Sequence, residues 1–320
     1  MKDGLLLGID IGGTKTAVIQ GTATGEVLDR HEWPSRAERG PHAMLAEIVA
    51  AARKFSYSAV GVSIGGPLNS PEGIIYSPPN LPGWDAFPLK AFLQRELDTP
   101  VNVEHDAAAC AYAEYLWGAG RNAHNLAYLT CGTGFGSGFV FGGKIHRGAR
   151  GGSCEAGHIG LRPDGPIAFG KRGSAESYCS GTALGLLAAW KFPDRWPHPP
   201  QGRELSDLAA SGDADALNII LINASAVGEI AAILADAVGL DCILLGSLAF
   251  YLGAPWLDEV RRSFEAHALP PIANGCRIEP AGLGKRLQDC SALAAALCEI
   301  RWGTLEDKLC LSEDAQNNVP

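Results

Sequence analysis

The sequence lacks the features that mark membrane, secreted and nucleic-acid-binding chains. No unbroken apolar run reaches the roughly 18 residues that a membrane span needs, and the N-terminal segment lacks the charged start and long apolar core of a signal peptide. There is no basic cluster, and the net charge of −9 argues against a broad surface for nucleic acid. These absences predict a cytoplasmic chain whose partners include neither membrane nor nucleic acid.

The nine cysteines lack the spacing of a disulfide framework or a metal site. Their number is odd, they are dispersed, and none forms a CxxC pair. We therefore expect free thiols in a reducing compartment, most of them small buried core residues.

The length and composition indicate a folded chain of two domains. The 320 residues are long for a single core, and 47% of them are hydrophobic while 19% are charged. Strand-like and helix-like segments alternate, which predicts the α/β class. The expected strands are 5–10, 16–20, 26–33, 58–64, 100–104, 125–131, 138–141, 145–148 and 241–245. The expected helices are 42–54, 89–97, 107–117, 181–190, 205–210, 214–238 and 287–300.

One pattern of strand, Gly-Thr turn, strand, Gly turn and strand occurs twice. The first copy contains GIDIGGTK and the second, about 120 residues later, contains GTGFGSG, which predicts a duplicated domain. Such turns expose backbone N–H groups that can bind phosphate oxygens, although either could also be an ordinary hairpin turn. Neither turn is a Walker A loop, because Thr14-Lys15 reverses the required order, and neither is a dinucleotide fingerprint.

A lone acid, Asp10, ends the first strand beside the glycines. A carboxylate next to a phosphate cradle would repel the ligand unless a cation lay between them, and Mg²⁺ bridges carboxylates and phosphates. Asp10 is therefore a candidate magnesium ligand, directly or through water. The alternative is that it caps its own turn.

Nine short motifs follow one another along the chain: GIDIGGTK, GVSIGGPLN, NLPGW, EHDAAA, GTGFGSG, GGKIHRG, EAGHIGL, GKRGSAESYCSG and ILLGS. In this order the chain resembles the ROK sugar kinases of the actin-like ATPase superfamily, over roughly residues 5 to 300. The resemblance implies a two-lobed actin-like ATPase (ribonuclease H-like) fold with a duplicated β-β-β-α-β-α core, an interdomain cleft and a homodimer. Residues 1–117 plus 298–320 would form the small lobe and 118–297 the large one.

The resemblance also implies the site. Phosphate contacts would come from both glycine turns and adenosine contacts from ILLGS, that is Gly12, Gly13, Thr14, Lys15, Thr133, Gly134, Gly246 and Ser247. The sugar would lie against Gly66, Asn80, His105, Asp106, Glu155, His158 and Glu176. His105 replaces the asparagine that usually precedes the catalytic aspartate in this family.

Asp106 matches the catalytic base of the family. It follows a short strand and precedes an alanine-rich helix, so its local sequence also suits a helix N-cap. His158 lies three residues after Glu155, close enough for both to point one way, although a lone histidine can also be structural. Asn80 could instead stabilise its turn, and Trp84 reads better as a core tryptophan than as a sugar platform.

The zinc motif of the family, C-x-C-G-x-x-G-C-x-E, aligns here with IAFGKRGSAE. Ile167, Phe169 and Ser174 replace the three cysteines and leave His158 without partner ligands, so we expect no zinc. Cys154 and Cys179 are nearby with the wrong spacing for a rebuilt site. We expect Ile167 and Phe169 to fill the space by apolar packing.

These features predict an enzyme that transfers the γ-phosphoryl group of Mg–ATP to a hexose, with glucose and its 6-hydroxyl as first choices. Three alternatives stay open: an inactive sugar-binding regulator, an N-acetylhexosamine kinase, and a kinase that uses polyphosphate. The cations to examine for polyphosphate are Lys15, Lys144, Arg147, Arg150, Lys171 and Arg172, of which the 171–172 pair reads as exposed turn charges. The loop 65–86 and hinges near 105–120 and 295–300 would let the lobes close.

Overall fold

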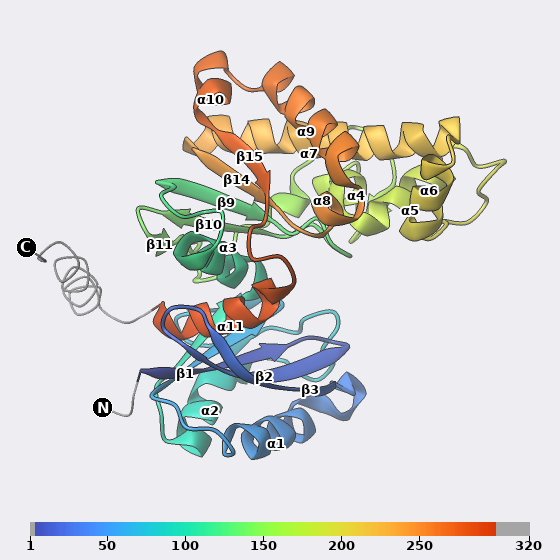
Figure 1. The fold of residues 1–320 in the computed structure, drawn as a ribbon. Helices are drawn as coiled ribbons and strands as arrows, with labels where there is room; N and C mark the ends of the chain where they lie inside the picture. Colours follow the sequence, from blue (N-terminus) through green and yellow to red (C-terminus); the bar gives the residue numbers. More distant parts are fainter. Residues whose placement is uncertain (1–3, 299–320) are drawn as a thin grey trace, which may run out of the picture.

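The computed structural model describes residues 4–298 as two α/β lobes stacked on each other (Figure 1). The expected C-terminal part of the small lobe, the hinge residues 299 and 300, the final tail and Cys310 lie outside the described residues. The eight described cysteines are free thiols, and six of them are buried, as expected from the sequence.

The first lobe is built on a five-stranded mixed sheet in the order β3-β2-β1-β4-β8. β1 pairs antiparallel with β2 and parallel with β4. The strands are β1 (Leu5–Ile11), β2 (Lys15–Thr22), β3 (Val27–Pro34), β4 (Ala59–Ile64) and β8 (Val101–His105). Except for the exposed edge strand β3, these strands are largely buried, which explains their near-continuous apolar sequences.

The second lobe repeats this topology with the order β11-β10-β9-β14-β15. β9 pairs antiparallel with β10 and parallel with β14. The strands are β9 (Asn125–Leu129), β10 (Ser137–Phe141), β11 (Lys144–Ile145), β14 (Cys242–Leu245) and β15 (Arg277–Pro280). In both sheets the first three strands form an antiparallel meander and two parallel strands follow. The duplication expected from the sequence is thereby confirmed.

The remaining elements cover these sheets or extend the lobes. The first lobe adds η1 (Ala37–Arg39), α1 (Gly40–Ala52), α2 (Leu89–Leu97) and a small sheet of β5 (Leu68–Asn69), β6 (Ile74–Ile75) and β7 (Phe87–Pro88). The second adds η2 (Ala156–His158), β12 (Ile167–Ala168), β13 (Lys171–Arg172), α4 (Ala175–Cys179), α5 (Gly181–Lys191), α6 (Gly202–Ala210), α7 (Ala214–Val238), α8 (Ser247–Tyr251), α9 (Gly253–His267) and α10 (Pro270–Gly275). The expected strand at 145–148 is reduced to β11.

Two helices cross between the lobes. α3 (Asp106–Trp117) follows β8 of the first sheet but packs on β9 and β10 of the second, whereas α11 (Leu287–Leu297), preceded by η3 (Gly284–Arg286), follows β15 and packs on β1 and β4 of the first. The two helices also contact each other, and Figure 1 shows them between the lobes. α3 of the first half of the chain thus packs on the second sheet, and α11 of the second half packs on the first.

The alanine-rich sequence of α11 matches glycines in the strands beneath it. A Cβ atom on Gly61 would lie 2.2 Å from the backbone oxygen of Ala292, and one on Gly8 would lie 2.9 Å from the Cβ of Ala292. Only strands without side chains at these points let the helix backbone approach so closely. The close contact fixes the returning helix on the sheet that carries Asp10.

α7 is the one helix of the described residues that is long and apolar enough to span a membrane. Its best window has a mean hydropathy of 1.9, so by length and composition it could do so, although polar residues interrupt its apolar runs. More than half of that window is buried inside the protein, where α7 packs against α9, α6 and α4. We therefore describe α7 as the central helix of the second lobe.

Candidate functional site

The first glycine turn is held by a serine that sequence reasoning missed. Buried Ser35, just after β3, donates through Oγ to the carbonyl oxygen of Gly12 at 2.5 Å and shares a 2.8 Å hydrogen bond with Thr16. Its backbone N–H donates to the oxygen of Thr14 at 2.9 Å. No local signal could have identified Ser35, because it is about 20 residues from the turn and only the pairing of β2 with β3 brings it there.

The same turn touches the loop expected to bind sugar. A Cβ atom on Gly13 would lie 2.7 Å from the Cβ and 2.9 Å from the carbonyl oxygen of Asn80. Asn80 itself is exposed, whereas Trp84 is fully buried and packs against Phe87 at 5.4 Å between ring centroids. The interpretation of Trp84 as a core residue is confirmed, and a phosphate candidate and a sugar candidate lie side by side.

Asp10 lies at the end of β1 in a strongly acidic environment. Its pKa is raised to about 7, mainly by burial and then by the charges of Asp106 and Asp289, while the charge of Arg30 opposes the shift. A carboxylate that is costly to ionise alone is suited to a cation, and carboxylate oxygens are donors that Mg²⁺ prefers. Within residues 4–298 no group of three or more acidic, histidine or cysteine side chains is placed to hold a metal. Phosphate oxygens or water would therefore have to complete the coordination of a magnesium ion at Asp10.

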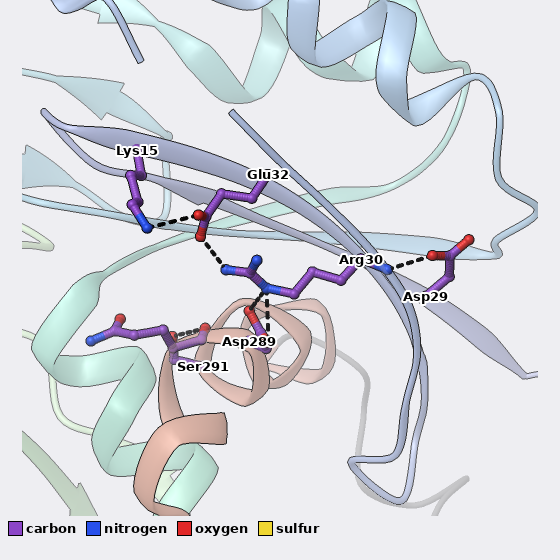
Figure 2. Close-up of polar contacts among 7 residues, drawn as sticks. Lys15, Asp29, Arg30, Glu32, Asp289 and Ser291 are labelled. Carbon is purple, nitrogen blue, oxygen red and sulfur yellow. Dashed lines mark hydrogen bonds and ion pairs between the residues drawn. The ribbon is translucent and has the colours of Figure 1, made fainter. Parts of the chain in front are cut away.

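A chain of ion pairs runs beside this site along β3 (Figure 2). Arg30 contacts Glu32 at 2.5 Å and Asp289 of α11 at 2.8 Å, while Lys15 contacts the other oxygen of Glu32 at 2.8 Å. Figure 2 shows the Lys15 ammonium directed at Glu32. Its assignment as a phosphate ligand stays a prediction, and Asp289 is a neighbour of Asp10 that the sequence did not indicate.

The second glycine turn and the expected adenosine loop line one pocket. Gly246 donates its N–H to the oxygen of Leu129 and Ser247 to that of Thr130, so α8 begins directly beside the turn. The pocket has a volume of about 560 Å³, and its lining includes Gly132, Thr133 and Ser247. Gly134 adjoins it in the turn. Sequence reasoning missed other residues of its lining, which are Pro199, Pro200, Gln201, Gly202 and Tyr251.

Glu176 connects this turn to the second-lobe sugar motif. Its carboxylate accepts a 3.0 Å hydrogen bond from the N–H of Phe135. It also lies 3.2 Å from where a Cβ of Gly134 would be and 3.1 Å from that of Gly157. Glu155 and His158 are both exposed, and the N–H of His158 donates to the oxygen of Glu155 at 3.1 Å, which closes the expected tight turn, η2.

Asp106 is the first residue of α3, and its side chain is 48% exposed. One oxygen accepts from the N–H of Ala107 at 2.6 Å, and the other lies 3.9 Å from where a Cβ of Gly65 would be. His105 is pressed against Gly66, whose Cβ would lie 2.8 Å from the imidazole Cδ2. The His105 Nδ1 atom is buried and lies 3.2 Å from Asp106 without the alignment of a hydrogen bond.

The aligned zinc segment forms the hairpin β12–β13 and corrects one expectation. Ile167 is 50% exposed and Phe169 is 64% exposed, so they do not fill the space by packing. The Phe169 ring lies edge-on to the His158 ring, with 6.4 Å between ring centroids. Ser174 is buried and caps α4 by accepting from the N–H of Ser177. Lys171 and Arg172 are exposed, as expected, although both reach backbone oxygens.

Comparison with known proteins decides the family. A model of the ROK family matches residues 6–297. The chain belongs to the ROK family. A glucokinase from Halalkalibacterium halodurans is 32% identical over 305 residues, covering 89% of this chain and 92% of the relative. An N-acetylmannosamine kinase from Yersinia pestis is 31% identical over 242 residues, covering 75% of this chain and 81% of the relative.

Solved structures agree with this assignment. A ROK hexokinase from Thermus thermophilus superposes with a TM-score of 0.82 at 29% identity, covering 95% of this chain and 99% of that one. A ROK family glucokinase from Streptomyces griseus, in complex with glucose and AMPPNP, superposes with a TM-score of 0.75 at 29% identity, covering 92% and 99%. The ROK chain described here thus has the two-lobed actin-like ATPase fold and is a homologue of sugar-phosphorylating enzymes.

Proposed function

We propose that this ROK protein is an ATP-dependent sugar kinase that phosphorylates a hexose, with glucose as the first candidate and its 6-hydroxyl as the acceptor. The observation that carries the proposal is that each glycine turn touches a residue expected to bind sugar. Gly13 packs on Asn80 in the first lobe, and Gly134 packs on Glu176 in the second. A nucleotide held by the two turns would therefore present its terminal phosphate to a sugar held between the lobes.

In this proposal Asp106 is the general base. The sugar hydroxyl gives its proton to the Asp106 carboxylate, a bond forms between the hydroxyl oxygen and the γ-phosphorus, and the bond from that phosphorus to the bridging oxygen breaks to release ADP. General base catalysis of this kind contributes roughly 10²–10⁴-fold. Asp106 suits the role because its carboxylate is half exposed beside the Gly65–Gly66 turn.

The other groups orient the reactants and neutralise charge. A magnesium ion near Asp10 would offset the negative charge that develops on the phosphates. Glu155, His158, Glu176 and Asn80 would pair with sugar hydroxyls, so that an epimer with a misplaced hydroxyl leaves polar groups unsatisfied. Thr133 and Ser247 line the pocket proposed for the nucleoside. We further propose the cytoplasm as the location and a homodimer as the assembly.

The relation to N-acetylmannosamine kinases supports a second acceptor class, the N-acetylhexosamines. A coupled assay of ADP release separates the candidates. Purified protein with ATP and magnesium is presented with glucose, mannose, galactose, N-acetylglucosamine and N-acetylmannosamine. In a parallel series polyphosphate replaces ATP, and formation of the sugar phosphate is measured directly because this donor releases no ADP. The proposal expects sugar-dependent ADP release that is highest with glucose. Sugar binding without ADP release from any of them would overturn it in favour of an inactive regulator.

A further inference from the structure

A buried ion pair joins the lobes two residues from the proposed base. Glu104 lies in β8 of the first sheet and is 2% exposed, while Arg147 follows β11 of the second sheet. The Nε of Arg147 donates to a carboxylate oxygen of Glu104 at 3.0 Å, and a terminal guanidinium nitrogen donates to the same oxygen. The contact therefore connects the second lobe to the strand that ends at His105 and Asp106.

A second contact fixes the same segment of the second lobe. The N–H of Ser70 donates to the oxygen of Gly151 at 2.9 Å. Gly151 has a φ of +74°, and a Cβ there would lie 2.6 Å from the side-chain oxygen of Asn69. Segment 147–151 is thus attached to the first lobe at both ends. A side chain at residue 151 would push the segment away from the first lobe.

This segment leads directly into the residues proposed to bind sugar. Cys154 follows three residues later, and its carbonyl oxygen accepts from the Ser137 hydroxyl at 2.6 Å, which ties the segment to β10. Glu155 and His158 come next, in η2. The position of these two side chains relative to Asp106 therefore depends on where segment 147–151 sits on the first lobe.

A buried ion pair of this kind fixes geometry better than it adds stability. The cost of removing both charges from water offsets much of their attraction, whereas removing one partner takes this contact from the remaining charge and is destabilising. Arg147 was also a candidate cation for a polyphosphate donor, but its guanidinium is bound to Glu104.

We propose that the Arg147–Glu104 pair is a positioning contact, which holds sugar-binding segment 153–158 in register with Asp106. The inference rests on the proposed function for the identity of the sugar-binding residues. Neither residue is assigned a chemical step. They act on the reaction through the relative placement of the two half-sites, and a displacement of about 1 Å can cost about 100-fold in rate.

The test compares Glu104→Gln, Arg147→Met and the double variant, with Arg39→Met as a control that breaks an exposed ion pair within the first lobe. The single variants should melt at lower temperature, and the double variant should regain part of the loss because neither charge then remains without the other. Its kcat/KM for glucose should nevertheless be ~10- to 100-fold below wild type, with the KM for ATP within ~2-fold. The Arg39→Met variant should match wild type in melting temperature and in kcat/KM for glucose.

Hydrogen exchange gives a readout that does not depend on turnover. Amides of segment 148–158 should exchange faster in the double variant than in wild type and Arg39→Met. Wild-type kcat/KM for glucose in a folded double variant, or unchanged exchange in this segment, would overturn the positioning role. If wild-type protein phosphorylated no sugar, the proposed function would fail, and the exchange comparison would still decide whether the pair holds the register.

Discussion

The Glu176 carboxylate accepts a 3.0 Å hydrogen bond from the backbone N–H of Phe135, so an acid at the start of α4 holds the second glycine turn. In the first lobe, Gly13 is packed closely against Asn80. Each lobe thus brings its glycine turn into direct contact with a residue proposed to bind sugar.

Replacing the proposed base should separate binding from turnover. Asp106→Asn keeps the size and the acceptor for the N–H of Ala107 but cannot take up the hydroxyl proton. We expect kcat to fall by at least ~100-fold while the dissociation constant for glucose changes little. Steady-state kinetics and calorimetric titration of glucose measure the two quantities. A variant with near wild-type kcat would refute Asp106 as the base.

The contact between Gly13 and Asn80 leaves no room for a side chain. Gly13→Ala should push the first turn away from the 65–86 loop, because the new Cβ would lie 2.7 Å from the Cβ of Asn80. We expect the KM for ATP to rise ~10-fold or more, since amides that point at phosphates must be held in place. Gly275→Ala is the matched control, because a Cβ there has no neighbour within 4 Å. Equal KM values for the two variants would contradict the phosphate role of the turn.

Stability of the ligand-free protein should depend on the ionisation of Asp10. Burial, followed by the charges of Asp106 and Asp289, raises its pKa from 3.8 to about 7, so the folded state binds a proton that the unfolded state has lost. The contribution of this group to the free energy of unfolding is therefore intact below pH 4, falls as the pH rises through 4 to 7, and stays low above 7.

Asp10→Asn removes that ionisation and should stabilise the protein at pH 8 by an amount on the order of a few kcal/mol, with little effect near pH 4. Thermal unfolding of both proteins in the presence of a chelator, over pH 4 to 8, measures the difference. A melting temperature for the asparagine variant below that of wild type at pH 8 would show that Asp10 is stabilised as a carboxylate without any cation.

The hairpin that replaces the zinc motif should hold no metal. Ser174 caps a helix and Ile167 and Phe169 are exposed, so three of the four ligand positions carry no donor for zinc. Elemental analysis of protein purified without chelator should find fewer than ~0.1 zinc per chain, and a chelator should leave the melting temperature unchanged, since a structural zinc would contribute to folding. Stoichiometric zinc would contradict this prediction.

Strands and long helices with strong local patterns could be predicted from the sequence. β1, β2, β4 and α7 lie within two residues of their expected ends. α9 was missed because Gly253 and Pro255 read as a loop, although proline is tolerated in the first turn of a helix. β15 was missed because its four residues, Arg-Ile-Glu-Pro, alternate too briefly to predict a strand, and pairing with β14 decides their conformation.

The candidate site also contains residues that the sequence indicated and residues that it did not. The glycine turns, Asp10 and Asp106 could be picked out as candidates from the sequence, because residue type and place at a strand end or turn admit phosphate chemistry and the ordered ROK motifs favour it over ordinary turns and caps. Ser35, Asp289 and the Arg147–Glu104 pair could not, because each meets its partner across a distance along the chain that no local pattern encodes. The sequence predicted that Phe169 is buried by apolar packing, and this prediction was wrong. An apolar side chain is buried only where another element covers it, and the Phe169 side chain is exposed.

By itself the sequence determined the α/β class, the duplication and the order of the phosphate and sugar motifs, because these follow from local hydrophobic period, glycine turns and strand ends. The tertiary structure alone decided that α3 packs on the second sheet, that Gly13 meets Asn80 and that Glu104 meets Arg147. Each of these contacts depends on how segments far apart in the sequence pack against one another. That packing is decided by the whole chain and not by the local sequence of one segment.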